Sequence, residues 1–285
     1  MVNKAPYPAS LLGESWRLIL HADQTGALIW NQIIHGYAAT NSPMTEKKLT
    51  DPAEIIRRIK ESEGERVSWK IQALHATFFI FAGNRHQLLN AIGSFEAPTN
   101  LPKLWTVENR PVLRTFQEEI ARLLHNFLAS AATLIDHTRI LVRDLYEGKP
   151  FYQEYQSKSE EVFDKSELTG LIKGLRDWML HKGLVPVVAT LSNAGPDNAL
   201  ISSVVLDLAK LRSWDKWDVR AKAYLAPLHS NPELDEIVSS YADLVESFYT
   251  WLEKRMHEIH SSAFQELDDL QNQLRVVQAA RAASE

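Results

Sequence analysis

Apolar side chains recur at steps of three and four residues along most of this chain, a spacing that places them on one face of an α-helix. One such stripe covers residues 68–92. A longer one begins at Pro111, a favourable residue for a first helical turn, and no glycine or proline interrupts it before Gly148. The pattern therefore predicts a helix over 68–92 and a single long helix over 111–147.

The second half of the chain repeats this rhythm in two places. A shorter stripe predicts a helix that Asp164 and Glu167 open as a capping box. Gly183 and Pro186 are the signals that end this helix. After Pro232 the last 53 residues contain neither glycine nor proline, so we predict one very long helix or two helices end to end.

Other segments lack a clear helical period. Runs rich in β-forming residues flank the sequence DQTG at 23–26, which favours a β-hairpin there, with a helix as the alternative. The stretch 36–54 is small, polar and broken by two prolines, which indicates a loop. The sequence NAGPDN at 193–198 indicates a further loop, and 199–211 is predicted to form a short helix.

These elements together predict a mainly α protein built as a helical bundle, with a long C-terminal helix and a small N-terminal β-hairpin. We divide the chain into three parts. Residues 1–60 form an N-terminal appendage with the hairpin and a loop, residues 61–231 form the bundle, and residues 232–285 form an acidic C-terminal helix that packs on the bundle.

Composition narrows the functional classes. The chain has 285 residues and no cysteine, which excludes disulfides, thiolate zinc sites and cysteine nucleophiles. The net charge of −5 argues against a large nucleic-acid surface, but the 11 acidic and 4 basic side chains after Pro232 leave the first 231 residues slightly basic. No apolar run is long enough to span a bilayer and no signal peptide is recognisable, so we expect a soluble, cytoplasmic protein without a membrane partner.

Candidate chemistry is concentrated near the end of the helix predicted before Gly183. Asp177 and His181 are four residues apart, so they share one helical face. Arg176 is five residues before His181 and lies about 140° around the helix from it. The two side chains can serve one site if two copies of this helix meet across a dimer axis, which would build a symmetric cleft.

The sequence RDWMLH at 176–181 resembles the signature of the HEPN superfamily, an arginine followed by a histidine four to six residues later at the end of a bundle helix. The resemblance covers about residues 68–190. It implies a homodimer whose paired motifs form a metal-independent endoribonuclease site. His181 would move protons at the ribose 2′-hydroxyl or the leaving oxygen, Arg176 would neutralise the scissile phosphate, and Asp177 would orient one of them. Many active members have asparagine where this chain has Asp177.

The surrounding charge favours an anionic ligand, since Lys173 and Lys182 stand beside the motif as candidate phosphate-binding residues. The expectation is an endoribonuclease of a toxin or phage-defence type that needs no cofactor or metal, with RNA as substrate and a neutralising or regulatory protein as a further partner. The alternative is a non-catalytic helical dimer that binds RNA, nucleotide or a protein through the same cleft. The non-functional interpretation is that Arg176 and Asp177 are ion-paired surface groups and that His181 only satisfies carbonyls of the last helical turn.

Two further sets of residues could carry chemistry. His257 and His260 lie three apart on the predicted C-terminal helix, where they could ligate a metal, although solvent-facing histidines fit the sequence better. Tryptophan side chains near the motif can stack on bases or serve as core anchors, and the second role is favoured; they are Trp178, Trp214 and Trp217.

Overall fold

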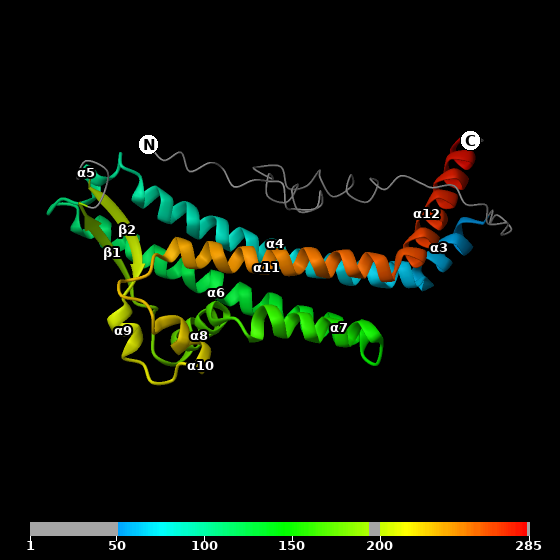
Figure 1. The fold of residues 1–285 in the computed structure, drawn as a ribbon. Coiled ribbons are helices and arrows are strands. Elements are labelled where there is room, and N and C mark those ends of the chain that lie inside the picture. The colour runs from blue at the N-terminus through cyan, green and yellow to red at the C-terminus, as the bar shows by residue number, and fades with distance from the viewer. Residues whose placement is uncertain (1–50, 194–199, 284–285) are drawn as a thin grey trace. The chain divides into compact units, whose positions relative to one another are not determined.

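The fold was obtained as a computed structural model, which describes residues 51–193 and 200–283 (Figure 1). Helices dominate these residues, and the predicted mainly α class is confirmed. The elements in chain order are α3 (Pro52–Glu61), α4 (Glu63–Glu96), α5 (Leu101–Leu104), α6 (Arg110–Tyr146), α7 (Pro150–Ser159), the π-helical turn η1 (Glu160–Asp164), α8 (Glu167–His181), β1 (Val187–Ser192), β2 (Ile201–Leu206), α9 (Leu208–Arg212), α10 (Val219–Leu225), α11 (Leu234–Ile259) and α12 (Ser261–Ala282).

The chain divides into two compact units, and each is described by itself. The first contains the described residues up to Ala73 and from Tyr249 onward. In it α3 packs against α12, and the buried ring of His260 places its Nδ1 3.2 Å from Oε1 of Glu63. The second unit, Leu74–Phe248, contains the candidate motif and is the unit that positions the site.

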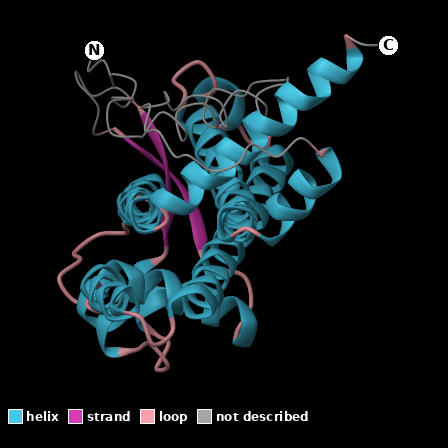
Figure 2. Ribbon diagram, turned by 90° about the vertical axis from the view of Figure 1, so that its right-hand side faces the viewer, coloured by secondary structure: helices cyan, strands magenta, loops and turns pink. Residues whose placement is uncertain are grey.

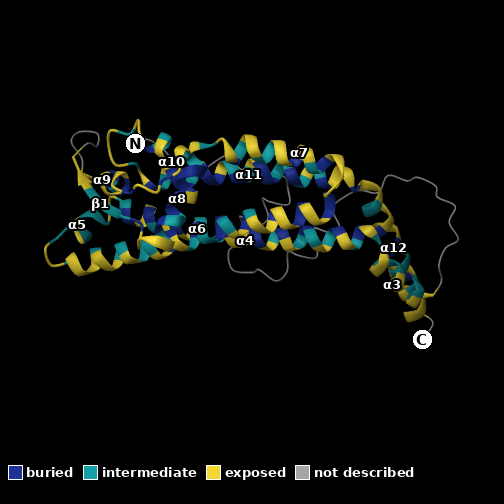
Figure 3. Cartoon of the chain, turned by 90° about the horizontal axis from the view of Figure 1, so that it is seen from below, coloured by how far each residue is buried: buried dark blue, intermediate teal, exposed yellow. Residues whose placement is uncertain are grey.

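The core of the second unit is organised by α4 and α6, which run antiparallel. Rings of α4 contact rings of α6 at two levels: Phe95 stacks on Phe116 with centroids 4.4 Å apart, and Phe81 lies 5.4 Å from Phe127. Tyr241 of α11 meets both Phe81 and Phe127 edge-on, and burial raises the pKa of its phenol. The apolar stripes predicted for α4 and α6 therefore form most of their buried faces, as Figure 3 shows along α6.

The β-hairpin was not predicted where it occurs. β1 and β2 pair antiparallel with Ala189 opposite Val204, and Figure 2 shows the two strands in magenta. The backbone N–H of Val204 donates to the Glu96 carboxylate at 3.0 Å, and the Ser202 hydroxyl donates to the Phe95 carbonyl at 3.2 Å, so the end of α4 holds β2. The predicted helix over 199–211 is wrong, because β2 occupies its centre and α9 its end.

Two further helix boundaries differ from or complete the predictions. The loop predicted over 36–54 is wrong at its end, because Asp51 caps α3 by accepting from the Ala53 amide and Pro52 begins the helix. The rest of that predicted loop lies outside the described residues. The region after Pro232 forms two helices, since α11 ends at Ile259 and α12 begins at Ser261. The hairpin predicted around residues 23–26 lies outside the described residues. Among the described helices, none is long and apolar enough to cross a bilayer.

Candidate functional site

The motif lies on α8, whose start is capped by a different residue from the one predicted. Ser166 is the N-cap, and its hydroxyl accepts a hydrogen bond from the Thr169 amide at 3.2 Å. The capping box predicted at Asp164 and Glu167 is therefore wrong: Asp164 belongs to the preceding π-helical turn, and Glu167 is the first residue of α8. A side-chain oxygen at the cap satisfies a backbone donor that the helix itself leaves free.

One face of α8 is held tightly against α10. A Cβ atom at Gly170 would stand 2.5 Å from Cβ of Arg220, and one at Gly174 would stand 2.5 Å from Cε3 of Trp217. The two glycines, four residues apart on one face, thus allow the helices to approach closely. Arg220 also donates to the carbonyl of Asp164 at 2.9 Å, so α10 is joined to the turn that precedes α8.

Three buried tryptophans complete this anchoring. Trp178 of α8 lies 5.3 Å from Trp214 and 5.9 Å from Trp217, and the latter two meet edge-on at 4.7 Å. The indole N–H of Trp217 donates to the Leu211 carbonyl, and that of Trp178 donates to the Leu184 carbonyl. All three side chains are buried, which confirms the core role and excludes base stacking on them in this conformation.

The C-terminal end of α8 comes directly after the tryptophan cluster. His181 is the last helical residue, and the amides of Lys182 and Gly183 both donate to the Trp178 carbonyl. Gly183 has φ +137°, a conformation that favours glycine, so the chain turns away from the helix here as predicted. The Lys182 ammonium lies 3.9 Å from the centroid of the Trp178 ring, a cation–π contact that covers the indole.

The candidate residues lie at different angles around α8: Asp177 and His181 fall on the side of Gly170 and Gly174, and Arg176 falls on the opposite side. Arg176 and Asp177 are half-buried, whereas Lys173 and His181 are exposed. In the part of the chain that the structure describes, the side chains of Arg176, Asp177 and His181 make no hydrogen bond or ion pair, so one chain does not bring Asp177 and His181 into contact. Within the described residues, the motif is therefore a set of polar side chains without hydrogen-bond or ion-pair partners, on a helix that is fixed by its packing.

Lys173 acts on the neighbouring helix as well. Burial raises the pKa of Asp218, the N-cap of α10, but the Ala221 amide, Arg220 and the charge of Lys173 together hold it below its usual value. Arg220 also forms an ion pair with Asp218 at 2.9 Å. Lys173 therefore contributes to the electrostatics of the α8–α10 junction, although its side chain remains exposed.

Two exposed leucines flank the motif and were not singled out from the sequence. Leu180 is 59% exposed and Leu184 is 68% exposed, on either side of His181. The signal was present, because Leu180 lies off the apolar stripe that forms the buried face of α8. The two side chains leave apolar surface on both sides of His181 in the sequence.

His257 and His260, for which solvent exposure was the favoured prediction, belong to no metal-binding cluster of described residues, and the prediction is wrong for His260. His257 is exposed, with Nε2 3.9 Å from a Glu253 carboxylate oxygen on its own helix, whereas His260 is buried beside Glu63. Within residues 51–193 and 200–283, no three histidine or carboxylate side chains gather as metal ligands would.

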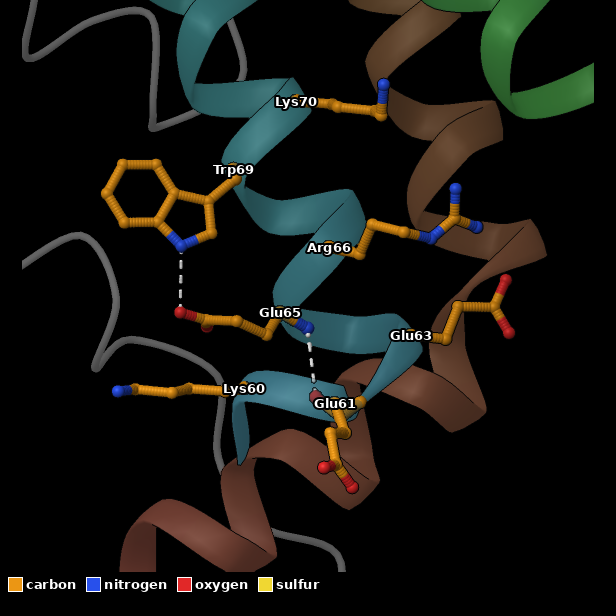
Figure 4. Close-up of a pocket in the computed structure, with 8 residues that line it drawn as sticks. Lys60, Glu61, Glu63, Glu65, Arg66, Trp69 and Lys70 are labelled. Carbon is orange, nitrogen blue, oxygen red and sulfur yellow. Dashed lines mark hydrogen bonds between the residues drawn. The ribbon is translucent and has the colours of Figure 1, made fainter. Parts of the chain in front are cut away.

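A second surface lies in the first unit, where α3 meets α4 (Figure 4). Trp69 is exposed there, and its indole N–H donates to Glu65 at 2.8 Å. Three basic and three acidic side chains line the same depression, so it carries no net charge that would select an anion; they are Lys60, Arg66, Lys70, Glu61, Glu63 and Glu65. None of the motif residues belongs to it.

Comparison with protein-family models, with curated proteins and with solved structures finds no match for this chain. The functional argument therefore depends on the residues of α8 and their surroundings.

Proposed function

We propose that the protein is a homodimeric endoribonuclease of the HEPN type, in which the α8 ends of two copies form one RNA-binding cleft. The observation that carries the proposal is the state of Arg176 and His181: both lie on a helix that glycine and tryptophan contacts anchor, His181 is exposed at its end, and neither side chain makes a hydrogen bond or ion pair within the described residues. Substrate-binding and catalytic side chains need a rigid scaffold that holds them in the productive geometry.

The exposed leucines support the dimer. Leu180 and Leu184 flank His181, so a second copy that covered them would bring its own His181 and Arg176 close to the first pair. An isologous contact puts equivalent residues opposite one another across the axis. Arg176 and His181 would then face each other between chains, which their angular separation on one helix does not allow.

The chemistry proposed for this cleft is transesterification at an RNA phosphate. An imidazole of one His181 takes the proton of the ribose 2′-hydroxyl while the 2′-oxygen attacks the adjacent phosphorus. The bond from phosphorus to the 5′-oxygen breaks, and the imidazolium of the other His181 protonates that leaving oxygen. The products are a 2′,3′-cyclic phosphate and a free 5′-hydroxyl. Arg176 donates to the phosphate oxygens on which negative charge builds up.

The neighbouring charges shape this proposal. Lys173 is exposed on the same side of α8 and adds positive charge for the RNA backbone. Lys182 covers the Trp178 ring, so its first role is to hold the turn after His181, and it reaches phosphate only by leaving the ring. Asp177 is a negative group beside Arg176, and it disfavours an RNA phosphate on that face.

Asp177 is the observation that favours a second candidate function. With a carboxylate next to the phosphate-binding guanidinium, the same dimer cleft would bind RNA, nucleotide or a basic protein segment without cleaving RNA. Replacement of Asp177 by asparagine removes the repulsion and keeps the side-chain shape, so Asp177→Asn is expected to increase cleavage or RNA affinity.

The test incubates purified protein with end-labelled single-stranded RNA in EDTA. Wild type is expected to release fragments ending in a cyclic phosphate, and Arg176→Lys and His181→Gln are expected to lose that activity. Lys222→Gln, which removes one exposed positive charge from α10, is the matched control and should cleave like wild type. Binding without fragments assigns the second function, and equal cleavage by wild type and His181→Gln contradicts the proposal.

A further inference from the structure

β1 is the outer strand of the β-hairpin in the second unit (Figure 2). All of its residues are half-buried or exposed, whereas four of the six residues of β2 are buried. The far side of β2 is occupied by the chain that precedes α11, since Val205 forms a bridge with Glu233 and the Leu206 amide donates to the Pro232 carbonyl at 3.0 Å. Among the described residues, β1 therefore pairs with a strand on one side only.

The register shows which backbone groups of β1 point away from β2. The Asp207 amide donates to the carbonyl of Pro186, the residue that faces it, at 2.9 Å, so this facing pair is hydrogen-bonded. In an antiparallel ladder such pairs alternate with pairs whose amides and carbonyls point outward. By this alternation, the backbone groups of Ala189 and Leu191 point to the outer edge of β1.

The other strand confirms the alternation. Val204 faces Ala189, and its amide points away from β1 to donate to the Glu96 carboxylate at 3.0 Å. On β1, the outward amides of Ala189 and Leu191 have no hydrogen-bond partner in the described residues. Backbone donors of this kind are satisfied by water or by another strand.

The side chains of β1 do not protect this edge. Exposed edge strands are usually protected by charged residues, by proline or by a bulge, each of which prevents pairing with another chain. The strand sequence VVATLS contains no charge and no proline, and its register with β2 is regular over all six residues. The edge is therefore a template for one further strand.

The composition of β1 favours a second copy of itself as that strand. Two antiparallel strands related by a two-fold axis place each residue near the axis opposite the same or a neighbouring residue, so a charge there would face a like charge. β1 has no charge, and it offers small, β-branched and apolar side chains. Only five residues separate His181 from Val187, so the α8 end and β1 are at most about 22 Å apart along the chain.

We propose that β1 pairs antiparallel with β1 of a second copy, so that the hairpins of two chains form one continuous sheet. The outward amides of Ala189 and Leu191 donate to outward carbonyls of the partner strand. The proposal goes beyond the proposed function, because it depends on the backbone of β1 and holds whether or not the dimer cleaves RNA. Another segment of the same chain is the competing occupant of the edge.

Amide hydrogen exchange of the full-length protein, measured residue by residue with mass spectrometry, tests the pairing. Where light scattering gives a dimer, the amides of Ala189 and Leu191 should exchange as slowly as those of Val188 and Thr190, which bond to β2. On dilution to the monomer, only Ala189 and Leu191 should lose protection. Fast exchange of these two amides in the dimer overturns the proposal and leaves the α8 contact of the proposed function intact.

Two other results of the same measurement would also overturn the proposal. Protection of Ala189 and Leu191 in a monomer assigns the edge to another segment of the same chain. A protein that is monomeric at every concentration has no partner strand, and the RNA cleavage assay then decides separately whether the proposed function survives.

Ala189→Pro tests the outward amide directly. Proline is tolerated where a strand N–H faces away from its neighbour, so the hairpin should form and the amides of Val188 and Thr190 should stay protected. Each copy loses one donor to its partner, and the dissociation constant of the dimer should rise at least about tenfold. An unchanged dissociation constant contradicts the proposal.

A charge at the edge is the second variant. Thr190→Lys places like charges across the two-fold axis and should also weaken the dimer. Ser203→Lys is the matched control, because Ser203 faces Thr190 on β2 and stands one strand farther from the axis, and it should dimerise like wild type. Equal dimerisation of Thr190→Lys and Ser203→Lys would argue against pairing at β1.

Discussion

Gly174 of α8 lies directly against the indole of Trp217, so close that a Cβ atom would stand 2.5 Å from Cε3 of the ring. Gly170, one turn earlier, meets the backbone of α10 in the same way. The sequence GLIKG thus describes a helix–helix contact, and the arginine and histidine that follow it extend from a surface that cannot shift easily. Close packing of α8 at Gly170 and Gly174 is what gives the polar groups farther along the helix a defined position.

Addition of one methyl group should therefore break this contact. Gly174→Ala forces the Trp217 ring or α10 to move, and overpacking of this kind costs about 1–3 kcal/mol of unfolding free energy. The matched control is Gly83→Ala in the middle of α4, where a Cβ would meet nothing within 4 Å. There the substitution should stabilise the protein by about 0.5–1 kcal/mol, the ordinary helical preference of alanine over glycine. Urea unfolding measures both, and equal stability of the two variants would contradict the packing argument.

The cap of α8 gives a second prediction. Ser166→Ala removes the hydroxyl that accepts from the Thr169 amide and should cost about 1 kcal/mol, whereas Ser166→Asp keeps an acceptor and should preserve stability. Asp164→Ala tests the capping box that the sequence suggested and should change stability by less than about 0.5 kcal/mol. Thermal unfolding of the three variants distinguishes the caps. A larger loss for Asp164→Ala than for Ser166→Ala would favour the cap expected from the sequence.

The ion pair of Arg85 and Glu246, which joins α4 to α11 within the second unit, has a predictable pH dependence. Burial raises the pKa of Glu246 above its usual 4.5, although Arg85 acts to lower it. The folded protein therefore binds the proton more tightly than the unfolded chain, and the stability that Glu246 contributes is largest at low pH and falls as pH rises through its raised pKa.

Arg85→Leu should increase that dependence, because it leaves the Glu246 carboxylate buried without its cation. We expect a loss of about 2–3 kcal/mol at neutral pH and a smaller loss below pH 4.5, where the carboxyl is neutral. Arg85→Leu combined with Glu246→Leu removes both charges and should not show the difference between the two pH values. Urea unfolding at each pH is the measurement. A loss that is equal at both pH values would mean that Glu246 does not depend on Arg85 for its burial.

The sequence predicted those elements whose conformation depends on nearby residues, and it did not predict those that depend on contacts distant in sequence. The long helices α4 and α6 were predictable because their apolar period is sustained over many turns and agrees with one buried face each. The hairpin was not, because ISSVVL at 201–206 is a short apolar run that fits a helix or a strand equally well. Its strand conformation depends on pairing with β1 and on the groups it meets at the end of α4, which are distant in sequence.

The candidate site was predictable only as a set of residues. Gly183 and Pro186 were sufficient to place Arg176 and His181 near the end of a helix, and the structure has His181 as its last residue. The cap at Ser166 was missed because Asp164 with Glu167 fits the capping-box spacing, whereas Ser166 is followed by Thr169 at the third position. The hydrogen bond from the Thr169 amide identifies Ser166 as the cap. The position of Arg176 of one copy relative to His181 of the other depends on how two chains associate. A single chain does not show it, and so it stays a prediction.

The proposed contact between the α8 ends of two copies can be tested by substitution of Leu180 and Leu184. If Leu180 and Leu184 form the contact between two copies, Leu180→Glu with Leu184→Glu places four like charges in the interface and should convert the dimer to a monomer. The double variant should keep the stability of a folded chain, since both side chains are exposed in the monomer. Val219→Glu, at another exposed apolar position, is the control and should remain dimeric. Size-exclusion chromatography with light scattering gives the mass directly. A wild-type protein that is monomeric at all concentrations, or a double variant that remains dimeric, would remove this surface as the place where the two α8 ends meet.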